Sequence, residues 1–402
     1  MELKVRAIRI AAAAWTVAGL LGAPAAAQGP GVEASAVRSF ADPSSPQAAA
    51  FSQLRAALMS RGESELARGE AATATDTFDR VAQTQHAADI EMGLVRSYMQ
   101  AGQYRRALAF CAHVAGAHRD SAAAGALYAW LLRAGGQAAF ADRTLSATLE
   151  RAPQDAVALA AREAFASPRP VAAGLLLQAP HRMAPQAVML EGQAPVPERA
   201  AVVSSGVLIG DGSLALAPSA AVRPAATGPL WVRNGLGQTT LASVDAGAQP
   251  LEVFGVTVLR LAVPLDPGSA RGPAPRDPFA GSPGFAVEYA EADNPIPAWP
   301  WLTPGFFGAG EGDAGLRRLG IEVAGQRQGG PVLDAGGRLA GIVLRGPGSD
   351  ALMLPASRWR QLAGATTADA ADASPVARGF GAAADQAYES GLRLALQLIA
   401  PR

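Results

Sequence analysis

Residues 326–343 read QRQGGPVLDAGGRLAGIV, and this stretch decides the fold of the second half of the chain. Val332 and Leu333 form a short apolar run after Gly-Gly-Pro, and an Asp-Ala-Gly-Gly turn separates them from a second apolar run that begins at Leu339. Apolar runs on both sides of a glycine-rich turn are typical of a β-hairpin. The stretch therefore predicts two paired strands preceded by a tight loop.

Further short apolar segments surround this hairpin, separated by Gly, Pro and Asp turns. They occupy residues 187–190, 201–209, 213–217, 230–233, 239–244, 253–261, 284–289 and 351–355. Short strands at this spacing indicate an antiparallel barrel or sandwich. Residues 308–312 are rich in glycine and predict a flexible loop, and residues 357–363 predict a short closing helix.

Several of these segments resemble bacterial trypsin-like serine peptidases of the high-temperature-requirement type, and they do so in the family's order. Residues 205–212, SGVLIGDG, are similar to the family's Gly-Ser-Gly-Phe-Val-Ile strand and turn. Residues 328–331, QGGP, are similar to the Ser-Gly-Gly-Pro of its nucleophile loop. The resemblance covers residues 200–363 and implies an antiparallel double β-barrel of trypsin-like type.

The resemblance also places the family's catalytic triad, and all three positions hold other residues. Ala220 stands at the histidine base, Gly255 at the orienting aspartate and Gln328 at the serine nucleophile. An amide side chain has no ionisable O–H or S–H that a base can activate, so Gln328 cannot act as the nucleophile of acyl transfer. Gln326 replaces the glycine that lets the family's oxyanion loop turn inward. The sequence thus predicts a pseudopeptidase, with no catalytic residue.

Other residues offer little replacement chemistry. None of the four histidines lies beyond His181, and Lys4 is the only lysine, which excludes a Ser-Lys dyad. Asp211 and Asp334 sit in predicted turns, where their side chains suit turn geometry. No zinc cluster, phosphate loop or calcium loop is visible, so no metal and no cofactor are expected. A histidine from the linker, His181, or from a partner subunit remains an open route to chemistry.

The first half of the chain has a helical pattern with an internal repeat. Residues 88–121 and 122–155 are equal in length and align with matched landmarks, including turns at Gly102 and Gly136 and small residues at Ala107 and Ala141. A weaker copy precedes them, and residues 156–166 predict a capping helix. The period and landmarks resemble tetratricopeptide repeats. A generic alanine-rich helical bundle is the alternative.

Stacked helix pairs of this kind form a concave surface that receives peptides or partner helices. If the repeat register holds, first helices direct a set of methionine, tryptophan and arginine side chains toward that groove, which suit interface anchors. These partner-binding candidates are Met59, Met92, Arg96, Met99, Trp130 and Arg133. The single cysteine, Cys111, is expected to be a small core residue.

The chain begins with a basic segment, an apolar run and small residues through position 27, a pattern typical of a cleaved secretory signal. No cysteine follows the apolar run, so a lipid anchor is not expected. We predict a periplasmic or secreted protein without a membrane span after signal removal. Lys and Arg balance Asp and Glu at 34 each, which does not favour a nucleic-acid partner.

The sequence therefore predicts an α + β multidomain protein: an N-terminal α-solenoid, a double barrel and a C-terminal helix. The expected parts are a signal peptide (1–27), a flexible leader (28–48), the repeats (49–166), a Pro/Ala-rich linker (167–199), the pseudopeptidase domain (200–363), and a linker with an amphipathic helix over 382–399 (364–402). The expected function is a non-catalytic scaffold or adaptor for protein or peptide partners in the cell envelope. A hydrolase with a non-standard site and a holdase chaperone are the alternatives, and the oligomeric state is open.

Overall fold

The structure is a computed structural model, and it describes residues 46–167, 170–223, 228–247, 249–311, 315–323, 328–346, 350–360 and 379–401. The predicted signal peptide, nearly all of the predicted leader and Gln326 lie outside these residues, as do residues 361–363 of the predicted closing helix. Leu54–Arg402 form one compact unit, distinct from Met1–Gln53. None of the helices in the described ranges combines the length and hydrophobicity that a bilayer crossing needs.

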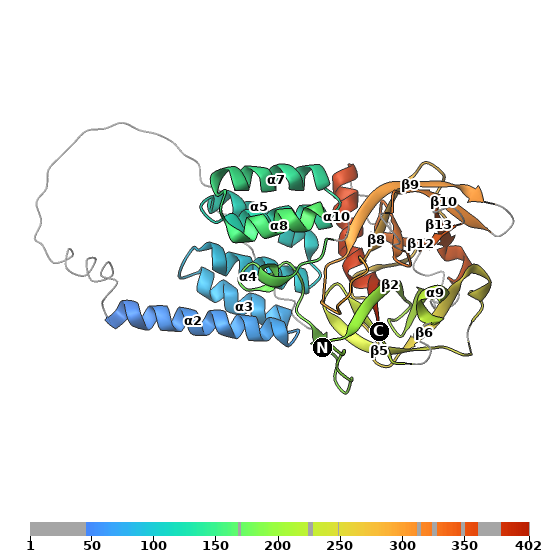
Figure 1. The fold of residues 1–402 in the computed structure, drawn as a ribbon, viewed down its shortest axis with the longest axis horizontal. Coiled ribbons are helices and arrows are strands. Elements are labelled where there is room, and N and C mark those ends of the chain that lie inside the picture. The colour runs from blue at the N-terminus through green and yellow to red at the C-terminus, as the bar shows by residue number, and fades with distance from the viewer. Residues whose placement is uncertain are drawn as a thin grey trace, which may run out of the picture. The chain divides into compact units, whose positions relative to one another are not determined.

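The first part of the compact unit is a stack of antiparallel helix pairs (Figure 1). The helices are α2 (Pro46–Ala67), α3 (Ala71–Ala82), α4 (Ala88–Gln100), α5 (Tyr104–Ala117), α6 (Ala122–Ala134), α7 (Ala138–Arg151) and α8 (Ala156–Ala166). Gly102 and Gly136 adopt positive φ angles of 73° and 83° at equivalent turns, where a side chain would be strained. Ala107 and Ala141 are fully buried where the paired helices cross. The expected tetratricopeptide architecture is confirmed.

The first barrel closes through six antiparallel strands in the order β5-β4-β14-β2-β3-β6, with β6 pairing back to β5. Its strands are β2 (Ala200–Ile209), β3 (Leu214–Pro218), β4 (Leu230–Asn234), β5 (Gln238–Val244), β6 (Val256–Leu261) and β14 (Ala395–Pro401). A helical turn, α9 (Ser219–Val222), follows β3, and η3 (Glu252–Phe254) precedes β6. Strand β1 (Val188–Met189) adds to the outside of β5 in parallel.

The second barrel closes in the order β11-β8-β9-β10-β13-β12, with β12 pairing back to β11. Its strands are β8 (Pro283–Glu288), β9 (Trp301–Glu311), β10 (Leu316–Gly320), β11 (Pro331–Asp334), β12 (Arg338–Arg345) and β13 (Ala351–Pro355). A short strand, β7 (Arg271–Pro273), joins β12 in parallel. The predicted hairpin is β11–β12, and the expected double barrel of trypsin-like type is confirmed.

The C-terminal segment differs from the prediction. Helix α10 (Phe380–Leu394) ends well before residue 399, and strand β14 follows directly. In the second barrel β8 lies between β11 and β9, and in the first barrel β14 lies in the equivalent place, between β4 and β2. With this correspondence the two barrels have the same strand order. The chain's last strand therefore completes its first barrel. Residues 187–190, expected to be the first strand, contribute only the edge strand β1.

Two smaller expectations also fail. The segment predicted as a flexible loop, 308–312, is part of β9 up to Glu311, because Gly310 and Glu311 pair with β10. The predicted closing helix begins with only a single turn, η5 (Ala356–Arg358). At residues 308–311 the next strand along the chain, β10, determines the local conformation by pairing with β9.

Helix α10 lies between the helix stack and the strands (Figure 1) and contacts both. On one side the rings of Tyr388 and Tyr104 pack edge to face with centroids 4.4 Å apart, and Glu389 binds the guanidinium of Arg105 at 2.8 Å. On the other side the Tyr388 hydroxyl donates a hydrogen bond to the carbonyl of Pro300 at 2.9 Å. The repeats and the barrels are thus joined through one buried helix.

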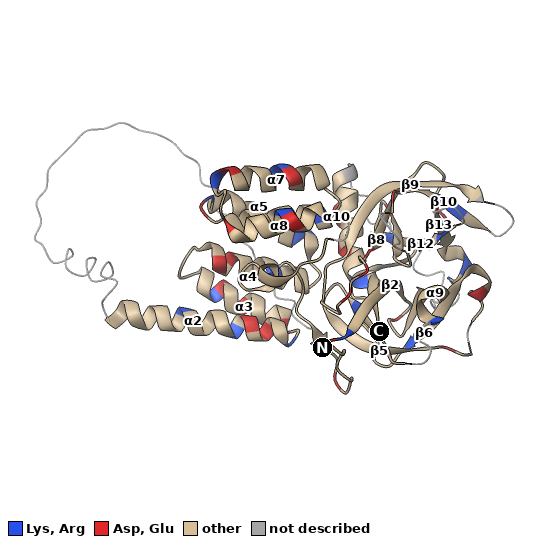
Figure 2. Ribbon diagram, viewed as in Figure 1, with Lys and Arg blue, Asp and Glu red and all other residues tan. Residues whose placement is uncertain are grey.

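Charged side chains of both signs are interspersed along the helices (Figure 2). Cys111 is buried in the helix stack, as expected for a core residue, and burial raises the pKa of its thiol.

Candidate partner-binding surfaces and the peptidase-like crevice

Two of the three predicted triad positions lie side by side at the ends of neighbouring strands. Ala220 is in α9, directly after β3, and Gly255 is the residue before β6. The backbone N–H of Ser219 donates to the Gly255 carbonyl at 2.8 Å. Both positions are exposed, and neither offers a side chain that can transfer a proton.

The third position, Gln328, lies in the loop before β11 and is held against the first barrel. Its carbonyl accepts hydrogen bonds from Ser205 N–H at 3.2 Å and from the Ser204 hydroxyl at 3.1 Å. Gly329 has a φ of 90°, and a Cβ there would lie 2.2 Å from the Ser205 carbonyl oxygen and 2.6 Å from the Pro218 ring. The loop therefore packs directly on β2 and on the end of β3. These contacts bring the segments that hold the three positions together where the two barrels meet, and we refer to this junction as the crevice.

The hydroxyl groups in this crevice have structural partners. The Ser205 hydroxyl accepts from the N–H of Tyr289 at 2.9 Å, and the Ser219 hydroxyl accepts from the hydroxyl of Thr257 at 2.8 Å. The Ser204 hydroxyl is occupied by the Gln328 carbonyl. None of these three contacts joins a hydroxyl to a basic side chain, and the contact of Ser204 holds the Gln328 loop in place.

The two turn aspartates also have structural roles, as predicted. Asp211 Oδ1 accepts from the N–H and the hydroxyl of Ser213, and these bonds lower the pKa of the exposed carboxyl. Asp334 Oδ1 accepts from the N–H groups of Gly336 and Arg338, at 2.8 and 2.9 Å. Each carboxylate replaces a backbone acceptor within its own turn.

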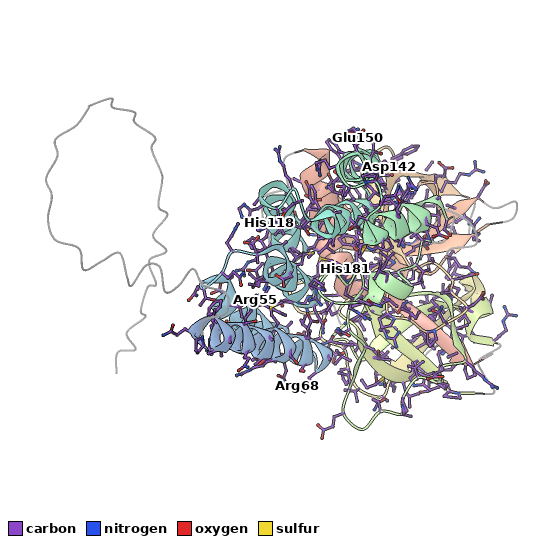
Figure 3. All side chains as sticks on the ribbon, turned by 60° about the vertical axis from the view of Figure 1, so that its left-hand side comes forward. Arg55, Arg68, His118, Asp142, Glu150 and His181 are labelled. Atoms are coloured by element: carbon purple, nitrogen blue, oxygen red, sulfur yellow. The ribbon has the colours of Figure 1, made fainter. Side chains whose placement is uncertain are left out.

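The structure describes all four histidines, and none of them contacts the crevice. His181 is buried in the linker, with Nε2 at 2.9 Å from the carbonyl of Leu175. Burial lowers the pKa of His181, and its electrostatic neighbours are Arg96 and Asp155 of the helix stack. The other three lie in the repeats, and Figure 3 labels His118 there, apart from His181. The linker histidine is therefore not a general base for the three crevice positions.

Four of the six predicted partner-binding side chains lie in the interior of the protein. Met92, Met99, Trp130 and Arg96 are buried, with at most 3% of each side chain exposed. Arg96 forms two hydrogen bonds with the carboxylate of Glu63. These four side chains are packing residues in this conformation and are not available to a partner at the surface.

The chain's own linker and second barrel cover this face of the repeats. Gln186 N–H donates to the Gln100 side-chain oxygen at 3.3 Å. The Trp130 ring lies 5.5 Å from that of Trp301 on β9. Linker side chains such as Met183 belong to the same apolar core as the helices. The sequence pattern locates the groove but carries no sign that an internal segment fills it.

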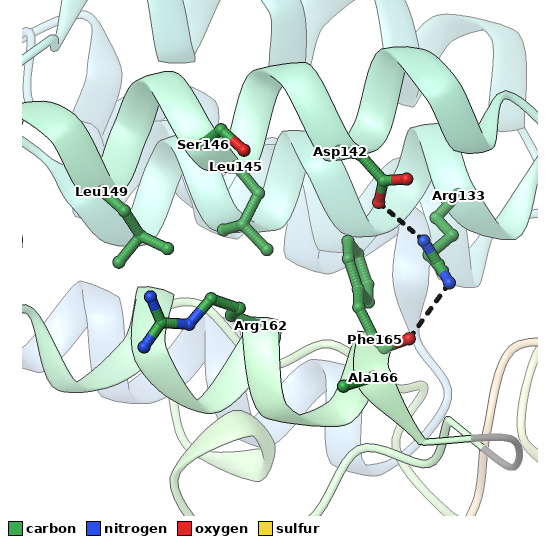
Figure 4. Close-up of a pocket in the computed structure, with 8 residues that line it drawn as sticks. All are labelled: Arg133, Asp142, Leu145, Ser146, Leu149, Arg162, Phe165 and Ala166. Atoms are coloured by element: carbon green, nitrogen blue, oxygen red, sulfur yellow. Dashed lines mark hydrogen bonds and ion pairs between the residues drawn. The ribbon is translucent and has the colours of Figure 1, made fainter.

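The remaining two candidates are less buried. Met59 packs against the core from α2. Arg133 binds Asp142 at 2.7 Å and the carbonyl of Phe165 at 3.1 Å (Figure 4). Arg133 therefore lines an accessible site, although a different one from the predicted groove.

This site is an open pocket of about 330 Å³ between α7 and α8 (Figure 4). Its lining combines apolar side chains with two arginines, one aspartate and one serine: Arg133, Asp142, Leu145, Ser146, Leu149, Arg162, Phe165 and Ala166. A neighbouring hollow along α8 is lined by Ala156, Leu159, Ala160, Arg162, Glu163 and Ala166. The two share Arg162, an exposed guanidinium on α8. We call this combined surface the α7–α8 pocket.

The chain joins a stack of antiparallel helix pairs to two six-stranded antiparallel barrels with the same strand order. The family model described as "Tetratricopeptide repeat" matches residues 65–131. No match is found among curated protein sequences.

Two solved structures with similarity to this chain are a protease domain and a serine endoprotease. One is the MamO protease domain from Magnetospirillum magneticum, at 17% identity and a TM-score of 0.30, covering 42% of this chain and 96% of that one. The other is the serine endoprotease from Yersinia pestis, at 16% identity and a TM-score of 0.32, covering 44% of this chain and 64% of that one. This chain thus spans less than two thirds of the Yersinia structure. The fold assignment rests on the strand order of the two barrels.

Proposed function

We propose that this protein is a non-catalytic scaffold or adaptor, exported to the cell envelope, that binds protein partners. The observation that carries the proposal is the sequence resemblance to trypsin-like peptidases, in which Ala220, Gly255 and Gln328 align with the family's base, orienting acid and nucleophile. Acyl transfer requires a nucleophile within reach of a base, and none of these three side chains can serve as either. Tetratricopeptide repeats support a role in protein binding.

The surface we assign to a partner is the α7–α8 pocket, because the chain's own linker and β9 cover the inner face of the repeats. The pocket offers Leu149 and Leu159 as partly buried apolar contacts beside the exposed Arg162. A bulky apolar side chain followed by a carboxylate fits this combination, since an arginine binds a carboxylate in a planar, bidentate manner. We therefore expect a partner segment of acidic and apolar residues.

Catalytic inactivity is tested with a fluorophosphonate probe and an unfolded protein substrate. The purified full chain should show no covalent labelling and no cleavage under conditions in which an active trypsin-like peptidase shows both. Labelling that disappears in a Ser204→Ala/Ser205→Ala variant would overturn the proposal in favour of a hydrolase with a non-standard site.

Partner binding is tested by crosslinking and mass spectrometry in cells, with two matched charge reversals. Arg162→Glu lies in the α7–α8 pocket, and Arg143→Glu lies on α7 outside the residues that line it. A specific partner should be lost in the first variant and kept in the second. Equal crosslinking of many unfolded proteins in both variants would instead favour a holdase. Cell fractionation of the tagged full chain tests export, and a cytoplasmic location would contradict it.

A further inference from the structure

Three of the four histidines converge on one buried carboxylate in the helix stack. His86 Nε2 lies 2.9 Å from Glu91 Oε1, and His118 Nε2 lies 3.0 Å from Glu91 Oε2. The ring of His86 is 4.6 Å from that of His118 and 5.9 Å from that of His113, measured between centroids. The side-chain ligand atoms of His86, Glu91 and His113 all lie within 4.8 Å of one another.

These residues come from three separate places in the repeats. His86 is in the loop between α3 and α4, Glu91 is in the first turn of α4, and His113 is in α5. Only 5% of the Glu91 side chain is exposed, whereas His86 and His113 are exposed. The Glu91 carboxylate is thus buried in the helix stack, and the two imidazoles beside it are accessible from solvent.

The donor set matches the preferences of a transition metal. Imidazole nitrogens and a carboxylate oxygen bind Zn²⁺ at roughly 2.0–2.2 Å, and two His with one Glu leave a fourth position for water or another ligand. The separations of the donor atoms must contract on binding, and rotation of the two exposed histidine side chains permits this. His118 meanwhile contacts the second oxygen of Glu91, as groups that orient a metal-binding carboxylate do.

We propose that His86, Glu91 and His113 form a transition-metal site, with Zn²⁺ as the best fit, and that His118 positions the Glu91 carboxylate. The ion would join the α3–α4 loop, α4 and α5, which belong to consecutive repeats. Its fourth coordination position would face solvent, where a side chain of another protein could enter. This inference does not depend on the barrel crevice or on the α7–α8 pocket.

The test uses the full chain purified without a histidine tag and stripped with a chelator. Titration with Co²⁺ should produce visible absorption bands of a four-coordinate ion at one equivalent, and Zn²⁺ should displace them. Zn²⁺ should also raise the thermal unfolding midpoint, because a ligand that binds only the folded chain stabilises it.

Four variants separate a metal site from a structural ion-pair cluster. His86→Gln/His113→Gln and Glu91→Gln should lose the bands, and His118→Gln should weaken Co²⁺ binding by roughly 10- to 100-fold, as expected for a positioning residue. His181→Gln removes the histidine outside the cluster and should bind like the wild type. Circular dichroism confirms that each variant is folded. Absence of the bands in the wild type, or equal affinity in the double variant, would overturn the proposal.

Discussion

The sharpest prediction concerns strand β14, whose seven residues, Ala395–Pro401, lie between β2 and β4 in the sheet of the first barrel. Leu398 is fully buried and pairs with Ser204 on β2 and with Val232 on β4. Its side chain lies against the bare backbone of Gly206, where an added Cβ would meet a Leu398 methyl group at 3.1 Å. A glycine has no side chain that can move into a space left by a smaller residue at 398.

Leu398→Ala should therefore leave a cavity that does not collapse. Buried Leu→Ala substitutions cost about 2–5 kcal/mol, and the cost increases with the volume that remains empty. We expect the upper part of this range, about 3–5 kcal/mol, which is a large share of the 5–15 kcal/mol that typically stabilises a folded domain. Deletion of residues 395–402 should prevent the first barrel from closing.

The assay is urea denaturation of the full chain followed by circular dichroism, combined with hydrogen exchange of the peptides that contain β2 and β4. The matched control is Leu54→Ala, since Leu54 is 58% exposed and its truncation should change stability by less than about 0.5 kcal/mol. Amides of β2 and β4 should exchange faster in Leu398→Ala alone. If the two variants have equal stability and equal exchange, β14 is not part of the barrel.

Three further predictions follow from single contacts. His181→Gln should flatten the pH dependence of the free energy of unfolding. Because burial lowers the pKa of His181, the wild type is most stable above pH 6.5 and loses stability as the pH falls below that value. Urea titrations of both proteins at pH 7.5 and pH 5 measure the difference. Gly329→Ala should destabilise the folded chain more than Gly281→Ala does in the same assay. Both glycines have a positive φ, which costs an alanine about 1–3 kcal/mol, but only Gly329 also lacks space for a Cβ. Equal costs would contradict the packing of the loop on β2. Tyr388→Phe should cost about 1–3 kcal/mol in urea, since it leaves the buried carbonyl of Pro300 without its donor, and no change would mean that this bond is absent.

The repeats and most strands could be predicted because their signals are local. Gly102 and Gly136 have the same spacing as Ala107 and Ala141, and this repeat alone indicates helix pairs, whatever surface they pack against. Alternating apolar residues and Gly or Asp turns report strands in the same way. The assignment of Ala220, Gly255 and Gln328 to the family's triad positions came from the resemblance of short motifs and stays a prediction.

The largest error occurred where a distant segment determines the conformation. Residues 395–400 read ALQLIA, an alternation that suits a strand, but they continue the helical spacing of Tyr388 and Leu392 and were assigned to the helix. These residues form a strand because they pair with β2 on one side and with β4 on the other. The histidine cluster was missed for a related reason, since His86, Glu91 and His113 come from a loop and two helices.

The covered inner face of the repeats affects how the proposed scaffold would bind a partner. Gln186 and Trp301 occupy the surface that would otherwise receive a partner, and Tyr388 and Arg393 of α10 contact α5 and the Ala101 carbonyl from the other direction. The repeats use these contacts to hold the double barrel at a fixed position. A partner in the α7–α8 pocket would therefore be held at a fixed distance from the barrel crevice and from the histidine cluster. If the proposed scaffold works in this way, its recognition sites are on the outside of the repeats, and the inner pattern of Met, Trp and Arg reflects intramolecular packing.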